Sequence, residues 1–372
     1  MTWQIIDSNY EQAKITVIGI GGGGGNSVNH IIKSGIKGVE FICANTDSQD
    51  LAKVQKAKKI KLGKDFTKGL GAGNDPERGR AATELSKSEI KEALEHTEML
   101  FIVAGMGGGT GTGGAPVVAK IAKDLGILTV AIVTTPFKYE QEKRAEQAAA
   151  GIAKLMQSVD SLIEIDNEKI FEIFPENAQF NQGFNAVNEV IANAVRGVSN
   201  VILNPATMNV DFADVQAAMS QKGMAIMCIG KASGPNRAAA AVNDALGNPF
   251  FNRAEVKNAK GLLVNICGPS GMEMQEINEI MTHAQKISQQ GVEAIPGLTI
   301  DESFGDEISV IIIATGLRRF NLDEFSTSYI RPVRDLPPLN TKENQGYVDP
   351  DKLKRIDILE IIRSIVGSVR CV

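Results

Sequence analysis

Short apolar runs alternate with helical patterns along the first half of the chain. The run KITVIGI at 14–20 predicts a buried strand, and Val28, Ile31 and Ile32 then recur at helical spacing. The other predicted strands are 39–44, 99–105, 127–133 and 161–165, and the other predicted helices are a charged one near 80–96 and one over 115–126. Apolar strands that alternate with helices are typical of a parallel, doubly wound α/β sheet.

A long helix is predicted over residues 180–202. The stretch contains no proline, and Asn204-Pro205 follows where the helix is expected to end. Its apolar residues recur at intervals of three and four, which indicates a helix buried along one face. They are Val187, Val190, Ile191, Ala194, Val198, Val201 and Ile202.

A second, smaller α/β block follows the long helix. Residues 223–230, 261–268 and 308–316 predict strands, and the stretches 236–246 and 274–287 predict helices between them. Beyond Leu317 the apolar pattern weakens and the chain becomes polar and contains prolines, which is typical of a linker. The last segment, 352–372, alternates basic and apolar residues and predicts a short amphipathic element.

Composition narrows the class of protein. The hydrophobic content of 43% and charged content of 22% are those of an ordinary globular protein, and the net charge of −5 argues against a nucleic-acid partner. Cys43, Cys228 and Cys267 lie in apolar runs without C-x-x-C spacing, which predicts buried, reduced thiols. The N-terminus lacks the pattern of a signal peptide, and no apolar run reaches about 18 residues. We therefore expect a cytoplasmic protein.

Two glycine-rich segments, 19–27 and 105–114, each leave a predicted strand and enter a predicted helix. We interpret both as loops at the carboxyl ends of strands, where open parallel sheets bind ligands. Backbone N–H groups and the helix dipole favour an anion at such a place, and missing side chains let a phosphate come close. Thr110 and Thr112 could add hydroxyl donors.

The first segment alone also fits a dinucleotide site. Gly19, Gly21 and Gly24 satisfy G-x-G-x-x-G, and Asp47 follows about 20 residues later, as that fingerprint requires. A dehydrogenase that binds NAD is therefore an alternative. A second phosphate loop favours instead a nucleotide with a longer phosphate chain, and the G-x-x-x-x-G-K-[ST] loop is absent.

The segment GGGTGTGG (107–114) resembles the signature of the tubulin/FtsZ superfamily. GGGGGNSVNH (21–30), CANTD (43–47), GLGAGNDPE (69–77) and NVDFADV (209–215) resemble the FtsZ family of bacterial cell-division GTPases. The matching segments run in order from about residue 14 to 317. The resemblance implies a doubly wound GTPase domain that a long central helix joins to a smaller α/β domain, with GTP or GDP bound across the strand ends and Mg²⁺ carried by the phosphates.

The resemblance also assigns roles to individual residues. The nucleotide would be bound through the first glycine segment, the terminal phosphate approached by the GLGAG loop, and the phosphates wrapped by the second segment. These residues are Gly22, Gly23, Gly24, Gly25 and Asn26, then Ala72 and Gly73, then Gly109, Thr110 and Gly111. No protein metal ligand is expected.

Four further positions would contact the ribose and the base. Glu140 and Arg144, four residues apart, would lie near the ribose, although their spacing alone fits a surface ion pair. Phe184 would stack on guanine and Asn188 would bind its edge, although without the resemblance they fit a core aromatic residue and a surface or capping amide. Asn167 is a further candidate for guanine.

Hydrolysis needs a group that positions water, and the glycine segments contain none. Asn209, Asp211 and Asp214 lie at the end of the long helix, about 30 Å from the base at a rise of 1.5 Å per residue. Taken alone, D-F-A-D predicts a turn with helix-capping aspartates. The resemblance implies catalysis in trans: this loop covers the nucleotide of the next subunit, and a contact that does not close produces a filament.

The resemblance sets the domain boundaries and the partners. We expect a flexible N-terminus (1–12), a GTP-binding domain (13–179), the central helix (180–204), a C-terminal domain (205–318) with its catalytic loop (205–215), a linker (319–351) and an amphipathic tail (352–372). The expected partners are further copies of the chain, head to tail in the division ring at mid-cell, and an actin-like membrane tether.

The tail departs from the pattern of the family. Asp357, Ile358 and Arg363 fit the tether-binding peptide, but the proline and phenylalanine of that peptide are missing. A direct but weak membrane contact and a weakly packed end therefore stay as alternatives. For the whole protein, the remaining alternative to a polymerising GTPase and a dehydrogenase is a scaffold that binds nucleotide and assembles without hydrolysis.

Overall fold

The computed structural model describes residues 13–169, 171, 180–203, 212–247, 259–286, 292 and 294–317. All of them belong to one compact unit, Met1–Arg319. The linker and the tail, with Cys371, lie outside the described residues. Among the residues that are described, no helix has the length and apolar character needed to cross a bilayer.

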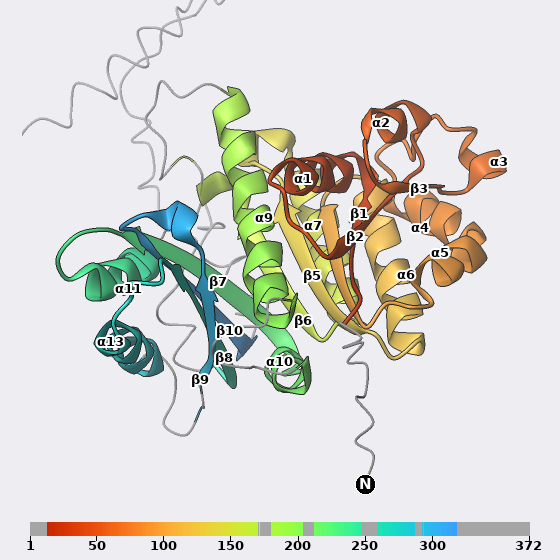
Figure 1. Ribbon diagram of the computed structural model, residues 1–372. Coiled ribbons are helices and arrows are strands. Elements are labelled where there is room, and N and C mark those ends of the chain that lie inside the picture. The colour runs from red at the N-terminus through yellow and green to blue at the C-terminus, as the bar shows by residue number, and fades with distance from the viewer. Residues whose placement is uncertain are drawn as a thin grey trace, which may run out of the picture. The chain divides into compact units, whose positions relative to one another are not determined.

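The first half of the unit alternates strands and helices as predicted (Figure 1). All its strands pair in parallel, in the order β3-β2-β1-β4-β5-β6. The strands are β1 (Ile15–Ile20), β2 (Val39–Asn45), β3 (Lys58–Lys61), β4 (Met99–Gly105), β5 (Leu128–Thr135) and β6 (Ser161–Asp166). The helices are α1 (Gly21–Lys33), α2 (Ser48–Lys53), α3 (Lys64–Thr67), α4 (Pro76–Leu85), α5 (Lys87–Leu94), α6 (Thr110–Asp124) and α7 (Glu142–Leu155), with short 3₁₀ turns η1 (Lys138–Glu140) and η2 (Asn167–Lys169).

The second half continues the same sheet, which has ten strands in the order β3-β2-β1-β4-β5-β6-β7-β10-β8-β9. β7 pairs in parallel with β6, and β10 pairs antiparallel with both β7 and β8. The strands are β7 (Gly223–Ala232), β8 (Gly261–Gly268), β9 (Ala294–Ile300) and β10 (Ile308–Leu317). The helices are α9 (Phe180–Leu203), α10 (Phe212–Met219), α11 (Arg237–Gly247) and α13 (Met274–Gln285), with a 3₁₀ turn η3 (Glu302–Phe304).

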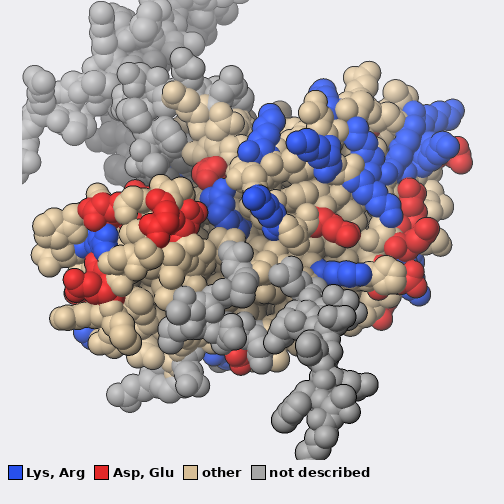
Figure 2. All heavy atoms as spheres, in the orientation of Figure 1, with Lys and Arg blue, Asp and Glu red and all other residues tan. Residues whose placement is uncertain are grey.

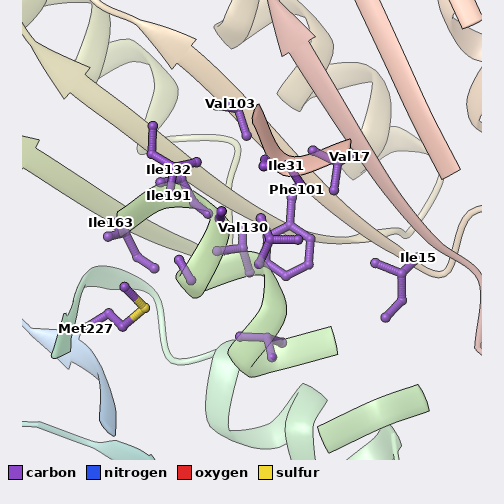
Figure 3. Close-up of a cluster of buried hydrophobic side chains, with 14 of the residues drawn as sticks. Ile15, Val17, Ile31, Phe101, Val103, Val130, Ile132, Ile163, Ile191 and Met227 are labelled. Carbon is purple, nitrogen blue, oxygen red and sulfur yellow. The ribbon is translucent and has the colours of Figure 1, made fainter. Parts of the chain in front are cut away.

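Helices cover both faces of the sheet, as a doubly wound fold requires. On one face α1 and α9 bury Ile31 and Ile191 against Val17, Phe101 and Val130 of the strands (Figure 3). On the other face α4, α5, α6 and α7 pack against the alternate side chains of the same strands. A third cluster joins α11 and α13 to the strands of the second half. Strands buried on both faces explain why the runs are apolar throughout rather than alternating.

Lysine marks the β3 edge of the sheet. Lys58 and Lys59 on β3 are exposed, and Figure 2 shows basic side chains gathered over this end of the molecule, around α2 and α3. An edge strand presents unpaired backbone groups, and charged side chains protect it from pairing with another chain. The strand was not predicted because its KKIK sequence has a single apolar residue.

Two predictions about helices are wrong in detail. The glycine run 21–25 is not a loop but the first turns of α1, and α6 begins within the second glycine segment, at Thr110. The charged helix near 80–96 is two helices, α4 and α5, which meet at Ser86. The Ser86 hydroxyl makes no capping hydrogen bond to α5 and instead accepts one from Gly63 N at 3.0 Å.

Candidate nucleotide site

The two glycine segments lie against each other at the carboxyl ends of β1 and β4. A Cβ added to Gly21 would lie 3.0 Å from Gly111 N, and one added to Gly23 would lie 3.4 Å from the Cα of Gly105. Gly21 has a φ of +75, a conformation that glycine adopts without strain, and this turn carries the chain directly from β1 into α1. The structure therefore brings the two segments together at the strand ends.

The first turns of α1 and α6 have no side-chain cap, whereas two neighbouring helices do. The N-cap residues of α1 and α6 are Ile20 and Gly109, and neither makes a capping hydrogen bond from its side chain. By contrast, Asp47 caps α2 and Asp75 caps α4. α3, α5 and α7 also lack a side-chain cap. α1 and α6, however, begin at the carboxyl ends of β1 and β4, where the free N–H groups of a first helical turn can bind an anionic ligand.

The hydrogen bonds of Asp47 help to decide whether the first glycine segment forms an NAD site. Its Oδ1 accepts hydrogen bonds from Gln49 N at 2.8 Å and Asp50 N at 3.2 Å, so the carboxylate is engaged at the start of α2. The acid that the fingerprint requires to bind a ribose hydroxyl thus serves as a helix cap in this chain. This arrangement disfavours an NAD site.

Only part of the second glycine segment faces outward. A Cβ on Gly113 would lie 1.9 Å from the carbonyl oxygen of Pro76, and one on Gly111 would lie 2.4 Å from that of Gly105. These glycines allow α6 to pack closely against α4 and the strands. At Gly108, in contrast, the nearest atom to an added Cβ is 3.9 Å away.

The hydroxyl groups of Thr110 and Thr112 hold the second segment in place. Thr112 is 3% exposed, and its hydroxyl accepts a hydrogen bond from Gly107 N at 2.8 Å. The Oγ1 of Thr110 lies 2.6 Å from that of Thr46. Thr112 therefore shapes the loop from inside, contrary to its expected role as an outward donor, while Thr110 is partly exposed at the start of α6.

The GLGAG loop lies beside this segment, as the sequence predicts for residues that share a site. A Cβ on Gly109 would lie 2.7 Å from the Cβ of Ala72, so the two backbones are in close contact. Gly73 has a φ of +64 and no atom within 4 Å of an added Cβ, which leaves its backbone facing open space. Ala72 is buried.

A pocket of about 550 Å³ opens next to the glycine segments, between α1, α9 and the end of β6. Its lining includes five predicted site residues, Gly23, Asn26, Asn167, Phe184 and Asn188. The other lining residues, which were not predicted, are Ser27, Asn29, His30, Lys33, Thr134, Asn185 and Val187. Asn167 is 7% exposed, and its buried Oδ1 has no hydrogen-bond partner among the described residues. A buried polar atom without a partner is costly, so a ligand that donates to Asn167 would be stabilised here.

Gly22, Gly24 and Gly25 do not line this pocket. A Cβ on Gly22 would lie 3.1 Å from Oδ2 of Asp50, and one on Gly25 would lie 3.6 Å from Val54. One on Gly24 would lie 2.4 Å from the carbonyl oxygen of Val103. These glycines allow α1 to sit directly on the strands and beside α2, so any contact they make with a ligand would be through their N–H groups.

Phe184 belongs to an aromatic cluster at the pocket. It is 37% exposed, and its ring meets that of Phe137 edge to face, with centroids 5.5 Å apart. The ring of Phe137 is buried and also contacts Tyr139 and Phe171. Phe137 was not among the predicted site residues; a phenylalanine next to Pro136 gave no signal of this role.

Glu140 and Arg144 form an ion pair, and the Oε1 of Glu140 also accepts a hydrogen bond from Phe137 N at 3.0 Å. A Cβ on Gly107 would lie 2.8 Å from the carbonyl oxygen of Arg144, so this pair is beside the second glycine segment. The surface ion pair expected from the spacing is thus present, at the edge of the site.

Of the three predicted catalytic residues, only Asp214 is among the described residues, and it does not line this pocket. Asn209 and Asp211 lie outside the described residues. Asp214 is exposed on α10, beyond the C-terminal end of α9, whose 24 residues span about 36 Å at 1.5 Å per residue (Figure 1). In the part of the chain that is described, no group of three or more His, Cys, Asp or Glu residues is placed to hold a metal ion.

None of the three described cysteines lines this pocket. Cys43, Cys228 and Cys267 are free and buried, as predicted. Burial raises the pKa of Cys43 and of Cys228 to about 12, so both thiols stay protonated at neutral pH.

Known proteins share both halves of this fold. Residues 14–175 match the family model "Tubulin/FtsZ family, GTPase domain", and residues 223–318 match "FtsZ family, C-terminal domain". The cell division protein FtsZ of Pseudomonas aeruginosa is 46% identical over 315 residues, covering 85% of this chain and 80% of that protein. FtsZ of Coxiella burnetii is 44% identical over 353 residues, covering 95% of this chain and 90% of that protein.

Solved structures share this fold as well. An empty FtsZ dimer from M. jannaschii has a TM-score of 0.77 at 40% identity, covering 83% of this chain and 92% of that one. CetZ2 from Haloferax volcanii, at 22% identity and a TM-score of 0.73, covers 85% of this chain and 97% of its own and shows the shared fold. With the two glycine segments and the pocket at the strand ends, these matches show that the chain belongs to the FtsZ family of cell-division GTPases.

Proposed function

We propose that this GTPase assembles head to tail into filaments of the division ring, and that each active site is completed by the next subunit. The observation that carries the proposal is the separation of the groups that face the nucleotide from the acidic residue Asp214. The uncapped helices and the pocket lie at one end of α9, and the glycine segments 19–27 and 105–114 contain no acidic or basic side chain. The acidic Asp214 lies beyond the other end.

In this proposal the nucleotide lies across the glycine segments with its base in the pocket. The N–H groups of residues 22–25 and 109–111 contact the phosphates, and Ala72 and Gly73 approach the terminal one. The unpartnered Oδ1 of Asn167 and the exposed face of Phe184 support a base in the pocket, because guanine offers N–H donors and an aromatic face. Glu140 and Arg144 lie at the ribose.

Magnesium would be carried by the phosphates, since Mg²⁺ in nucleotide sites usually keeps several waters and binds the phosphate oxygens. It would offset phosphate charge during transfer of the terminal phosphate. Asn209, Asp211 and Asp214 of one subunit would then orient and polarise the attacking water on the nucleotide of its neighbour.

Phosphate release tests the proposal. With GTP and Mg²⁺, the rate per subunit is expected to rise with protein concentration, because only assembled subunits have a complete site. Asp214→Asn is expected to lower the rate at least a hundredfold while GDP binding stays unchanged. A specific rate that does not depend on concentration would contradict completion in trans.

The proposed setting is the cytoplasm at the division site. Assembly with copies of itself follows from the filament, and an actin-like tether would act through the tail, 352–372. No nucleic-acid partner is proposed. Membrane contact would be indirect or weak.

A further inference from the structure

Ser27 lies on α1 and contacts Asn188 of α9 in the wall of the pocket. Its Oγ lies 3.1 Å from the carbonyl oxygen of Gly23 and 2.8 Å from Oδ1 of Asn188. Ser27 is 5% exposed, so solvent competes little for these contacts. Gly23, Ser27 and Asn188 all line the pocket proposed for the base.

One hydroxyl proton can make only one near-linear hydrogen bond, so it cannot fully satisfy both oxygens at once. A serine hydroxyl donates one hydrogen bond and can accept two. If Ser27 donates to Asn188, its contact with Gly23 places two oxygens together with no proton between them. A serine in a helix often donates to the carbonyl oxygen four residues earlier, which for Ser27 is that of Gly23. If Ser27 donates to Gly23 in this way, both contacts can still be hydrogen bonds. Asn188 must then supply the second proton.

We propose that Ser27 is a positioning residue that holds the Asn188 amide with Nδ2 on Ser27 and Oδ1 turned to the pocket. The two ends of an amide have the same shape, so the bonding partners decide its orientation. With Nδ2 donating to Oγ of Ser27 and Ser27 donating to Gly23, every polar group in the chain of contacts is satisfied. The inference rests on the proposed function, because it concerns recognition of the base.

The orientation decides which base fits. Guanine carries two neighbouring donors, N1–H and the 2-amino group, whereas adenine has an acceptor at N1 and no 2-amino group. An oxygen of Asn188 in the pocket therefore favours guanine, whereas an amide nitrogen would meet its donors without bonding. A buried polar group left without a partner penalises the wrong ligand, and this penalty is the source of selectivity.

Binding of GDP and ADP, measured by calorimetry on the full chain, tests the proposal without the complication of turnover. Ser27→Ala frees the amide to rotate, so GDP affinity is expected to fall about three- to tenfold, the range of a net hydrogen bond. ADP affinity should change less, so the GDP-to-ADP ratio falls. A loss of packing alone would weaken both nucleotides equally.

Asn188→Asp provides a second, independent test. A carboxylate presents an oxygen to the pocket in either orientation, so Ser27→Ala is expected to change the GDP-to-ADP ratio much less in the Asn188→Asp background than in the wild-type protein. Ser27→Thr keeps the hydroxyl and should keep the ratio. Ser34→Ala is the matched control, because it removes a 2.8 Å hydrogen bond from a serine hydroxyl to Ile31 O at the end of the same helix, and Ser34 does not line the pocket.

The outcomes separate this inference from the proposed function. An unchanged GDP-to-ADP ratio in Ser27→Ala would overturn the role of Ser27. An effect of Ser27→Ala on this ratio that is as large in the Asn188→Asp background as in the wild-type protein would overturn the orientation. Wild-type protein that does not prefer GDP over ADP would overturn the proposed function itself and this inference with it.

Discussion

At the scale of single residues, an added Cβ at Gly113 would lie 1.9 Å from Pro76 O, whereas at Gly108 the nearest atom would be 3.9 Å away. Gly113 thus permits the contact of α6 with α4, and Gly108 leaves open space where a phosphate could approach. The density of glycines in the sequence does not distinguish these two roles, because close packing and an open phosphate site both require glycine.

The two positions form a matched pair. We expect Gly113→Ala to lower the free energy of unfolding by about 1–3 kcal/mol, because the methyl group would force backbone apart in a packed region. Gly108→Ala should change it by less than about 0.5 kcal/mol, as for open surface sites, yet weaken GDP binding. Urea unfolding and calorimetry measure the two quantities. Equal destabilisation by both variants would contradict this division of roles.

Phe184 permits a similar comparison. Its ring packs edge to face on Phe137 and lines the pocket, so Phe184→Ala is expected to weaken GDP binding by about 1–3 kcal/mol, the range for stacking of a base on an aromatic ring. Phe171 contacts Phe137 as well but does not line the pocket. Phe171→Ala should therefore leave GDP affinity unchanged in a fluorescence titration, and an equal loss in both variants would refute stacking.

At the scale of elements, α11 and α13 are joined by ionic contacts. Arg237 of α11 donates from Nε and Nη2 to the two carboxylate oxygens of Glu276 on α13, at 2.7 Å and 3.0 Å, and from Nη1 to Asp306 at 2.8 Å. The hydrogen bond from Arg237 holds the pKa of Glu276 below its ordinary value of 4.5. The pair therefore stabilises the fold fully above pH 4.5 and loses its contribution as the pH falls through the lower, folded-state pKa.

Glu276→Gln tests this contact. The variant is expected to be about 1–2 kcal/mol less stable at pH 7, since a hydrogen bond to a charged group is lost. It should also lose less stability than wild type between pH 5 and about pH 3. Thermal unfolding across this range measures both effects. A parallel decline in the two proteins would show that Glu276 does not titrate as described.

The elements themselves show how far the sequence could lead. Strands buried on both faces were predicted within one or two residues, because their runs are apolar throughout. β9 was missed: it contains Pro296 and Gly297, which are tolerated because it pairs only with β8 at the edge of the sheet. The glycine run 21–25 looked like a loop, because its helical shape depends on contact with strands that lie far away in sequence.

The pocket shows the same limit. Phe184 and Asn188 were named through the resemblance to the family, and their shared lining of one pocket agrees with the interpretation. Ser27 and Phe137 were missed, because their roles depend on partners on other elements, Asn188 and Phe184. Spacing along one helix cannot reveal such contacts.

At the scale of the whole molecule, α9 connects the pocket to the acidic segment and also keeps them apart. Its buried face, including Ile191 and Val198, fixes α9 against the sheet, so this helix, about 36 Å long, holds its two ends apart. Asp214 on α10 follows the end of α9 that is opposite to the pocket. This arrangement supports the proposal that a neighbouring subunit completes the site.

Mixing two inactive variants tests whether a neighbouring subunit completes the site. Asp214→Ala keeps the pocket, and a Phe184→Ala, Asn188→Ala double variant keeps the acid but should not bind GTP. In a filament made from equal parts, about one contact in four places an intact acid over an intact pocket, given head-to-tail assembly. We predict that phosphate release is near background for each variant alone and rises clearly in the mixture. Completion of the site in trans would be contradicted if the mixture were no more active than the sum of its parts under conditions where light scattering shows joint assembly.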